Sequence, residues 1–493
     1  MACLPYPTFL DSPTRTPSVH SLSAVGRVRI HPLTCPGVSN SNDNASSQSA
    51  AAAASSSPAQ EEYQAILSKC IQQSRVDTSD KSKKENAKLR KKYMKEGVAM
   101  ASSYLANTLG IDVSIVDVEI VLHIDGIMDT DGCLASCFLD AGCAYVVIRV
   151  KEEKGYGLEK ALEACDATRV PRDRLVLHWK DDKTSELDTK SLVEITSHVG
   201  TISIQITDPL SSSRTEWNPP PVSKKIAKCV FQLSLPDELS NDDLTKSVAS
   251  LSKVIGENGG SITLVDPTYE QLGLCYAACM KTDRPDGLYT TVVCTRSNEA
   301  LGLVYSSKSS IIAALQCGRG VYYSRSRGGL WRKGDTSGHH QTLHRIDVDC
   351  DGDALRFTVT QNGDDGVKAF CHLNTLTCWG EPRGLRHLEG TLCQRLIDAP
   401  AGSYTKRLFD DEQLLRDKLV EEAQELSEAD TKEHVAEELA DVLYFAMVRA
   451  AKAGVSIDDA VSELDKRARK VTRRKGDSKP ERIEAGEKIL GKK

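Results

Sequence analysis

The sequence lacks several features that would place it in a whole class of proteins. It contains no run of about 18 apolar residues, so no membrane-spanning helix is expected. Its net charge of −6 offers no excess of positive charge, which argues against general binding to nucleic acid or to anionic membranes. The phosphate-binding fingerprints GxGxxG and GxxxxGK[ST] are both missing, so these two nucleotide-binding loops are excluded as well.

Cysteine is plentiful, at 16 residues, but no two cysteines stand at the Cys-x-x-Cys spacing. That absence excludes zinc ribbons and thioredoxin-like redox motifs. No secretory hydrophobic segment is found either, so a disulfide framework is not expected. We therefore expect most cysteines to be reduced and buried, with three available for a metal.

The length of 493 residues indicates several domains, because single hydrophobic cores stop growing near about 250–300 residues. A content of 40% hydrophobic and 27% charged residues is that of a soluble globular protein. Changes of pattern divide the chain into four segments, which are residues 1–80, 81–282, 283–398 and 403–493.

The first segment, residues 1–80, is expected to be disordered or a targeting segment. It is rich in Ser, Pro and Ala for most of its length, and such a stretch buries too little apolar surface to offset the entropy of ordering. Two interpretations stay open. A solvated tail would leave the protein cytoplasmic, whereas a transit peptide would direct it to a plastid or a mitochondrion. Scarce acidic residues and three arginines fit a transit peptide: Arg15, Arg27 and Arg29.

The second segment, residues 81–282, alternates apolar runs of strand length with helix-like stretches. This alternation predicts an α/β domain with a mostly parallel sheet, whose role the sequence does not define. One group of residues allows two interpretations, a structural or degenerate cluster and an active site: Asp125, Asp129, Asp131, Cys133, Cys137 and Cys143.

The last two segments differ in their hydrophobic period. Residues 283–398 form short alternating runs separated by polar turns, which predicts an α+β domain that is mostly β. After a linker at residues 399–403, apolar residues recur every three or four positions, which predicts an all-α domain of antiparallel helices. The fold is therefore expected to be multidomain, with α/β, α+β and all-α parts in that order.

Carboxylates and thiols gather in the mostly-β segment. Asp349, Asp351 and Asp353 are spaced by two in an alternating run, so they are expected on one face of a strand or its exit turn. Carboxylates gathered in this way suit Mg²⁺. On the same pattern Cys350 points to the opposite face. Three thiolates with one open position are a pattern for catalytic zinc: Cys350, Cys371 and Cys378.

Two acidic pairs stand in the helical segment, Glu422 with Glu425 and Glu438 with Asp441. A spacing of three places each pair on one helix face. Two antiparallel helices would then bring four carboxylates to one Mg²⁺ ion. The other interpretation is that both pairs are solvated helix faces.

The motifs of the mostly-β segment resemble those of phosphoribosyl-AMP cyclohydrolase. They are Leu330-Trp331, Lys333-Gly334, Thr336-Ser337-Gly338, the Asp-Cys-Asp-x-Asp core, and Cys371-His372 with Cys378. Beyond residue 403 the chain is similar to phosphoribosyl-ATP pyrophosphohydrolase, a family with MazG-like helices. Upstream of residue 283 it resembles, more weakly, the N-terminal part of fungal-type multifunctional histidine-biosynthesis proteins.

This resemblance implies a bifunctional hydrolase of histidine biosynthesis. The helical domain would hydrolyse phosphoribosyl-ATP to phosphoribosyl-AMP and pyrophosphate, with Mg²⁺ on its four acidic side chains as the catalytic group. The cyclohydrolase domain would then open the adenine ring at the N1–C6 bond, using zinc and Mg²⁺. His372 is a candidate general base for this step. In the family the zinc is shared across a dimer interface, so a homodimer is expected. The expected contacts to the nucleotide substrates are Arg325, Trp331, Lys333, Gly334, Ser337, Lys418 and Arg474.

Three further expectations limit this interpretation. Zinc nucleobase deaminases also attack purine C6, but only the first half of their signature is found, at His387-Leu388-Glu389, with no P-C-x-x-C after it. The alternative to an enzyme is an inactive scaffold of the same pathway. In fungal-type relatives a histidinol dehydrogenase domain often follows, and this chain is expected to lack that activity.

Overall fold

The structure, a computed structural model, divides the chain into two compact units, Met1–Ala369 with Lys466–Thr472 and Phe370–Asp465 with Arg473–Lys493. No helix in the parts that it describes is long and apolar enough to cross a membrane. The described residues are 5–9, 24, 28–30, 65–66, 68–70, 72, 83–105, 116–122, 129–150, 158–180, 189–206, 228–233, 240–257, 261–364, 368–380, 382–472 and 480–489.

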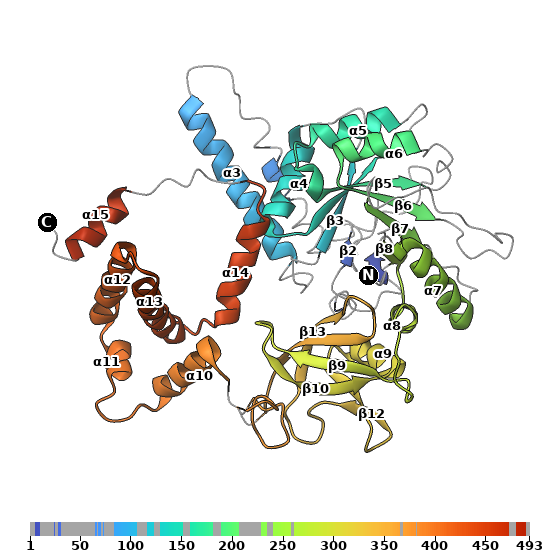
Figure 1. Cartoon of the computed structure of the whole chain (residues 1–493). Helices are drawn as coiled ribbons and strands as arrows, with labels where there is room; N and C mark the ends of the chain where they lie inside the picture. The colour runs from blue at the N-terminus through green and yellow to red at the C-terminus, as the bar shows by residue number, and fades with distance from the viewer. Residues whose placement is uncertain are drawn as a thin grey trace, which may run out of the picture. The chain divides into compact units, whose positions relative to one another are not determined.

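Eight parallel strands close into a barrel in the first unit (Figure 1). Each strand pairs with the next one along the chain, and the last strand pairs with the first. The strands are β1 (Pro5–Phe9), β2 (Val28–Ile30), β3 (Val116–Leu122), β4 (Tyr145–Val150), β5 (Leu175–Lys180), β6 (Thr201–Ile206), β7 (Lys228–Leu233) and β8 (Ser261–Val265).

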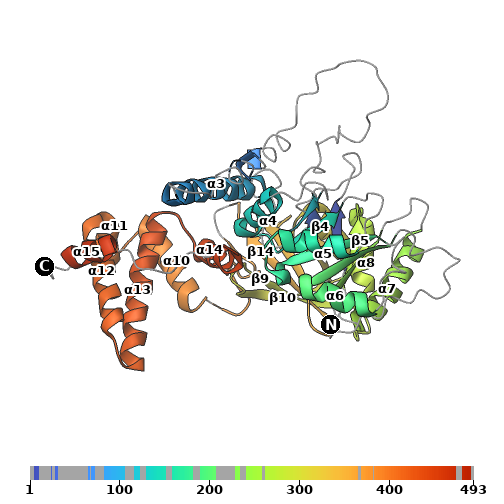
Figure 2. The ribbon, with the colours of Figure 1, turned by 90° about the horizontal axis from the view of Figure 1, so that it is seen from above.

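Helices provide the crossovers that parallel strands require, because the chain must return to the same end of the barrel before each new strand. Figure 2 shows α5 and α6 alongside β4 and β5, on the outside of the barrel. The helices of this part are α3 (Lys83–Ser103), α4 (Asp129–Ala141), α5 (Leu158–Ala167), α6 (Thr189–His198), α7 (Asn241–Glu257) and α8 (Tyr269–Ala278), with a short 3-10 turn at Arg172–Arg174.

A buried arginine crosses the interior of the barrel. Arg29 on β2 is fully buried, and its Nη1 donates hydrogen bonds to Ser203 Oγ on β6 at 2.7 Å and to Gln232 Oε1 on β7 at 3.0 Å. A buried charge is costly unless it is hydrogen-bonded. These contacts therefore hold β2 to the opposite wall.

The expectation of a disordered or targeting segment over residues 1–80 does not hold for β1 and β2, which are strands of the barrel. Arg29, which fitted a transit peptide, is instead a buried core residue. The reason is that strands of five and three residues need no long apolar run when neighbouring strands cover them. Most of the rest of residues 1–80 lies outside the described residues.

The sequence predicted a mostly parallel sheet for residues 81–282, and the structure closes that sheet into a barrel. Its proposed polar cluster is partly core, since Cys137 and Cys143 are fully buried and Cys137 Sγ lies 3.8 Å from Cys70 Sγ. This burial favours the structural interpretation for the two cysteines. The other four side chains lie outside the described ones: Asp125, Asp129, Asp131 and Cys133.

A six-stranded sheet forms the rest of the first unit, in the order β12-β11-β10-β9-β14-β13. Neighbouring strands are antiparallel except β14 and β9, which are parallel. This confirms the β-rich central part. Its elements are β9 (Tyr289–Cys294), β10 (Ala300–Ser306), α9 (Lys308–Cys317), β11 (Val321–Ser324), β12 (Gly329–Arg332), β13 (Gln341–Val348) and β14 (Ala354–Gln361).

Helix α8 joins the barrel to this sheet. Gly273 allows α8 to approach α9 closely, because a Cβ at that position would lie 2.6 Å from Ile312 Cγ1. Tyr276 is fully buried, and its hydroxyl donates to the carbonyl oxygen of Ile346 on β13 at 3.0 Å.

The second unit is helical, as its hydrophobic period predicted. Its elements are α10 (Gly384–Ile397), α11 (Tyr404–Asp410), α12 (Glu412–Glu428), α13 (Lys432–Lys452), α14 (Ile457–Arg469, whose last residues belong to the first unit) and α15 (Pro480–Ile489). Leu392 of α10 is buried in one core with Leu408, Leu415 and Val448. Helix α10 therefore belongs to the helical part, which begins before the expected start at residue 403.

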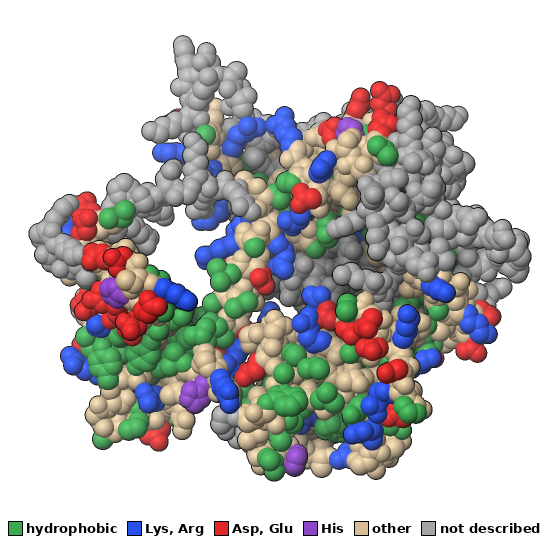
Figure 3. All heavy atoms as spheres, viewed as in Figure 1, with side chains coloured by type: hydrophobic (Ala, Val, Ile, Leu, Met, Phe, Trp, Pro, Cys, Tyr) green, Lys and Arg blue, Asp and Glu red, His purple; other side chains and the backbone are tan. Residues whose placement is uncertain are grey.

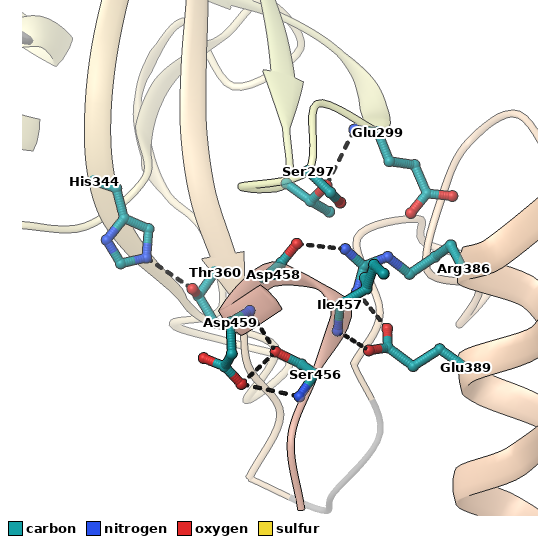
Figure 4. Close-up of polar contacts among 11 residues, drawn as sticks. Ser297, Glu299, His344, Thr360, Arg386, Glu389, Ser456, Ile457, Asp458 and Asp459 are labelled. Carbon is teal, nitrogen blue, oxygen red and sulfur yellow. Dashed lines mark hydrogen bonds and ion pairs between the residues drawn. The ribbon is translucent and has the colours of Figure 1, made fainter. Parts of the chain in front are cut away.

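A polar network fixes the start of α14 against α10 (Figure 4). Arg386 donates to Glu389 Oε2 at 2.5 Å and to Asp458 Oδ1 at 2.7 Å, while Glu389 Oε1 accepts the backbone N–H of Ile457 at 2.7 Å. Glu389 is therefore a structural residue here. That role agrees with the exclusion of a deaminase from the incomplete His387-Leu388-Glu389 signature.

Candidate functional site

The three aspartates of the cyclohydrolase-like segment lie in the hairpin turn between β13 and β14. Asp349 Oδ1 accepts the backbone N–H groups of Gly352 and Asp353 at 3.0 Å and of Ala354 at 3.2 Å, which fixes the turn. One oxygen from each of Asp349, Asp351 and Asp353 lies within 4.8 Å of the others. The exposed turn thus brings together the three carboxylates that their spacing predicted.

Crowding of these carboxylates affects their protonation. The negative charge of Asp351, followed by the hydrogen bond with Asp349, raises the pKa of Asp353. Desolvation raises the pKa of Asp349, but the backbone N–H of Ala354, the side chain of Asp351 and the other N–H groups of the turn outweigh it and lower that pKa. Three mutually repelling oxygens with one raised pKa fit a cation, which would relieve the repulsion.

Two of the three predicted zinc thiols share a loop. Cys371 is buried, and the loop closes where its backbone N–H donates to the carbonyl oxygen of Thr375 at 3.0 Å. The backbone N–H of Leu373 and then the side chains of Thr375 and Cys378 lower the pKa of the Cys371 thiol against the opposing effect of desolvation. His372 is exposed, and its Nδ1 lies 3.8 Å from Cys371 Sγ. A thiolate is the form that binds zinc, so this loop suits metal ligation.

The third predicted thiol, Cys350, lies in the other compact unit. It is exposed in the aspartate turn of the first unit, whereas Cys371 and Cys378 belong to the second unit. The thiol loop therefore supplies two of the three predicted zinc ligands, and a zinc site that also includes Cys350 stays a prediction.

Four predicted substrate contacts follow one another along β12 and its exit turn. Lys333 is buried, with its Nζ 5.6 Å from the ring centroid of Trp331, and that ring lies 6.0 Å from the ring of Tyr322. Ser337 Oγ accepts the backbone N–H of His339 at 3.3 Å. These positions remain predicted contacts, and the structure places them in one continuous segment with Gly334.

Gly334 is required by the shape of this turn. Its φ is +92°, and a Cβ there would lie 2.4 Å from the backbone N and Cα of His340. We predict that Gly334→Ala destabilises the sheet by at least about 2 kcal/mol, because positive φ and a backbone clash add. Gly329→Ala, in the same segment with nothing within 4 Å of the added atom, is the matched control. Urea unfolding followed by tryptophan fluorescence measures both, and equal midpoints would contradict the prediction.

The helical unit carries a second carboxylate group, on α12 and α13. One oxygen from each of Glu422, Glu438 and Asp441 lies within 4.8 Å of the others. Glu422 is buried, and Glu438 Oε2 is buried without a hydrogen-bond partner among the described residues. Figure 3 shows acidic side chains gathered over α12 and α13. An orphaned carboxylate oxygen beside two other carboxylates fits a divalent cation.

A lysine stands within this group. Lys418 Nζ lies 2.7 Å from Glu422 Oε1, 2.8 Å from Glu421 Oε2 and 5.5 Å from the ring centroid of Phe445. Desolvation lowers the pKa of Lys418, but its hydrogen bonds to Glu421 and Glu422 outweigh that effect and raise it. The ammonium is therefore held charged beside the carboxylates, where phosphate oxygens would meet it.

For three other residues of this site, the structure and the sequence-based prediction do not coincide. Glu425, predicted as a fourth ligand, is exposed and does not belong to the carboxylate group. Arg474 lies outside the described residues. Sequence reasoning missed His434, whose Nε2 lies 3.3 Å from Glu438 Oε1, although its spacing of four residues from Glu438 was an available signal.

Comparison with known proteins assigns these two groups to different families. The family model of phosphoribosyl-AMP cyclohydrolase matches residues 302–380, and that of phosphoribosyl-ATP pyrophosphohydrolase matches residues 385–468. The aspartate turn and the thiol loop lie in the first match. The carboxylate group of α12 and α13 lies in the second.

Curated relatives cover the same region. The chain is 57% identical over 203 residues to a histidine biosynthesis trifunctional protein of Komagataella pastoris, covering 41% of this chain and 24% of the relative. It is 46% identical over 276 residues to the histidine biosynthesis bifunctional protein his7 of Schizosaccharomyces pombe, covering 53% and 65%. It is 32% identical over 200 residues to the bifunctional protein HisIE of Pyrococcus furiosus, covering 38% of this chain and 93% of that protein. The chain thus spans about a quarter of the trifunctional relative.

Proposed function

Because the chain belongs to the family of histidine biosynthesis bifunctional proteins that join a phosphoribosyl-AMP cyclohydrolase to a phosphoribosyl-ATP pyrophosphohydrolase, we propose that it catalyses both reactions. Phosphoribosyl-ATP is hydrolysed to phosphoribosyl-AMP and pyrophosphate, and the adenine ring of phosphoribosyl-AMP is then opened by water. The observation that carries the proposal is that each matched region has its own compact carboxylate group.

In the helical unit the residues that would hold Mg²⁺ are Glu422, Glu438 and Asp441. The ion would neutralise phosphate charge, as in other phosphoryl transfers. Lys418, held charged on the same helix, binds phosphate oxygens of the nucleotide and keeps the scissile bond beside the carboxylates. Water attacks one phosphorus, the bond to the bridging oxygen breaks, and pyrophosphate leaves.

In the cyclohydrolase part, zinc would be held by Cys371 and Cys378, with Cys350 of the partner subunit as third ligand. Zinc supplies the Lewis acidity that makes water nucleophilic near neutral pH. His372, beside Cys371, accepts a proton at a ring nitrogen as water adds to C6. The N1–C6 bond then breaks, and the proton passes to N1. The aspartate turn would hold Mg²⁺ and orient the nucleotide.

The partners and location follow from the same proposal. A zinc ligand from a second subunit requires a homodimer, and the substrates are small nucleotides. We propose that the protein is cytoplasmic and that residues 1–60 are not cleaved off, because β1 and β2 are part of the barrel. N-terminal sequencing of the native protein tests this, and a start near residue 60 would instead favour import into a plastid or mitochondrion.

One assay tests the proposed function. The purified full chain, supplied with Mg²⁺ and Zn²⁺, is incubated with phosphoribosyl-ATP while pyrophosphate and the ring-opened product are followed. We expect pyrophosphate first and ring-opened product after it. Absence of both products with folded, metal-supplied protein would favour the inactive scaffold.

A further inference from the structure

Two arginines from distant segments contact the ring of one tyrosine on the central sheet. The guanidinium carbon of Arg325 lies 4.0 Å from the ring centroid of Tyr305, and that of Arg284 lies 4.5 Å from it. Two points so close to one centroid are separated by no more than the sum of those distances. The two guanidinium carbons are thus at most 8.5 Å apart, and an anion at the edge of the ring with several acceptor oxygens can reach cations within that distance of each other.

Each arginine is positioned by its own segment. Tyr305 on β10 pairs with Tyr323 on β11, and Arg325 follows in the turn directly after β11, where its guanidinium reaches the ring of Tyr305. Arg284 lies in the segment before β9. There Arg284 Nε and Nη2 donate to Asp286 Oδ1 at 3.0 Å and Oδ2 at 2.7 Å, which holds the guanidinium in place.

The charges of the pair are only partly compensated. Asp286 neutralises Arg284, and its hydrogen bond raises the pKa of that arginine. Arg325 is exposed and forms no hydrogen bond or ion pair with other residues in the part of the chain that the structure describes. A planar guanidinium braced on an aromatic ring keeps all its N–H donors available in a fixed plane, which suits a phosphate oxygen pair. One positive charge therefore remains unpaired beside a second, fixed guanidinium.

We propose that Arg284 and Arg325, braced on Tyr305, bind the phosphate monoester of a ribosyl phosphate. This assignment rests on the proposed function, since it gives the 5′-phosphate of phosphoribosyl-AMP its place on the cyclohydrolase sheet. Arg284 lies upstream of residues 302–380, so the matched region of the family supplies only Tyr305 and Arg325. The second guanidinium is a feature of the segment that joins the barrel to the sheet.

Binding of ribose 5-phosphate to the full chain, measured by calorimetry, tests the site without turnover. We expect Arg325→Ala to weaken that binding about tenfold or more, because hydrogen bonds to charged groups are the strong ones. Arg327→Ala is the matched control, since Arg327 is exposed in the same hairpin turn and makes no stacking contact with Tyr305. Tyr305→Leu should weaken binding, whereas Tyr305→Phe, which keeps the ring, should not.

The outcomes separate this inference from the proposed function. If ribose 5-phosphate binds and Arg325→Ala abolishes that binding while the wild type opens no adenine ring, the phosphate site stands and the proposed function fails. If the wild type is active, Arg325→Ala should raise KM for phosphoribosyl-AMP with little change in kcat. Equal affinity of Arg325→Ala and wild type, or an equal loss in Arg327→Ala, would overturn the site. Tighter binding of inorganic phosphate or pyrophosphate than of ribose 5-phosphate would overturn the assigned ligand.

Discussion

Replacing Cys371 by alanine is expected to abolish ring opening of phosphoribosyl-AMP while the release of pyrophosphate from phosphoribosyl-ATP continues. Cys371 is buried and its thiol pKa is lowered, which favours the thiolate form that binds zinc. Loss of even an indirect contact to a metal ligand costs about 10–100-fold, so loss of a ligand should cost more. Phosphoribosyl-AMP should therefore accumulate when the variant is given phosphoribosyl-ATP.

Cys393→Ala is the control for this substitution, because Cys393 is an exposed cysteine on α10 outside the loop. It should leave both activities and the zinc content unchanged. Metal binding and folding are coupled, so Cys371→Ala can also lower the melting temperature and slow the other reaction indirectly. Zinc content and melting temperature are measured beside the rates. Undiminished ring opening in zinc-free Cys371→Ala would refute the zinc assignment.

Local patterns in the sequence predicted local structure well. The spacing of Asp349, Asp351 and Asp353 predicted a strand or its exit turn, and the hairpin turn after β13 brings the three carboxylates together. The helical period beyond residue 403 predicted helices, and Leu415 and Val448 are buried in their common core. In both cases residues close in sequence determine the geometry, so period and spacing carry the necessary information.

Features that depend on contacts between distant segments could not be predicted. Barrel closure depends on the pairing of β1 with β8, which lie some 250 residues apart, and nothing in the composition of residues 5–9 signals it. The placement of α10 depends on Leu392 packing with Leu408 and Val448, which its own period does not specify. The stack of Arg284 and Arg325 on Tyr305 joins three segments in the same way.

The orientation of α12 about its axis decides which of its two predicted ligands belongs to the carboxylate group. A spacing of three places Glu422 and Glu425 on neighbouring positions of one helix face, yet they differ by about 60° around the axis at 3.6 residues per turn. Packing of α12 buries Glu422 and leaves Glu425 exposed. The sequence defined the face, and only the tertiary contacts defined which member of the pair enters the group.

Glu438→Ala is expected to remove phosphoribosyl-ATP hydrolysis while added phosphoribosyl-AMP is still opened. Glu438 brings a buried carboxylate oxygen, without a hydrogen-bond partner in the described part of the chain, to a group with Glu422 and Asp441, so its loss should lower kcat by more than about a hundredfold. Pyrophosphate release and ring opening are measured separately on the same preparation. Loss of ring opening in folded, zinc-loaded Glu438→Ala would contradict the assignment of two independent sites.

Glu425→Ala sharpens this test, because it removes a carboxylate of the same pattern from an exposed position outside the group. Since its oxygens lie apart from the other three, we expect less than about a threefold change, as for most surface substitutions. If Glu425→Ala lost as much activity as Glu438→Ala, all four carboxylates would have to meet at the ion. Helix α12 would then have to rotate to bring Glu425 inward when Mg²⁺ binds, and the three-carboxylate group would describe only the metal-free state.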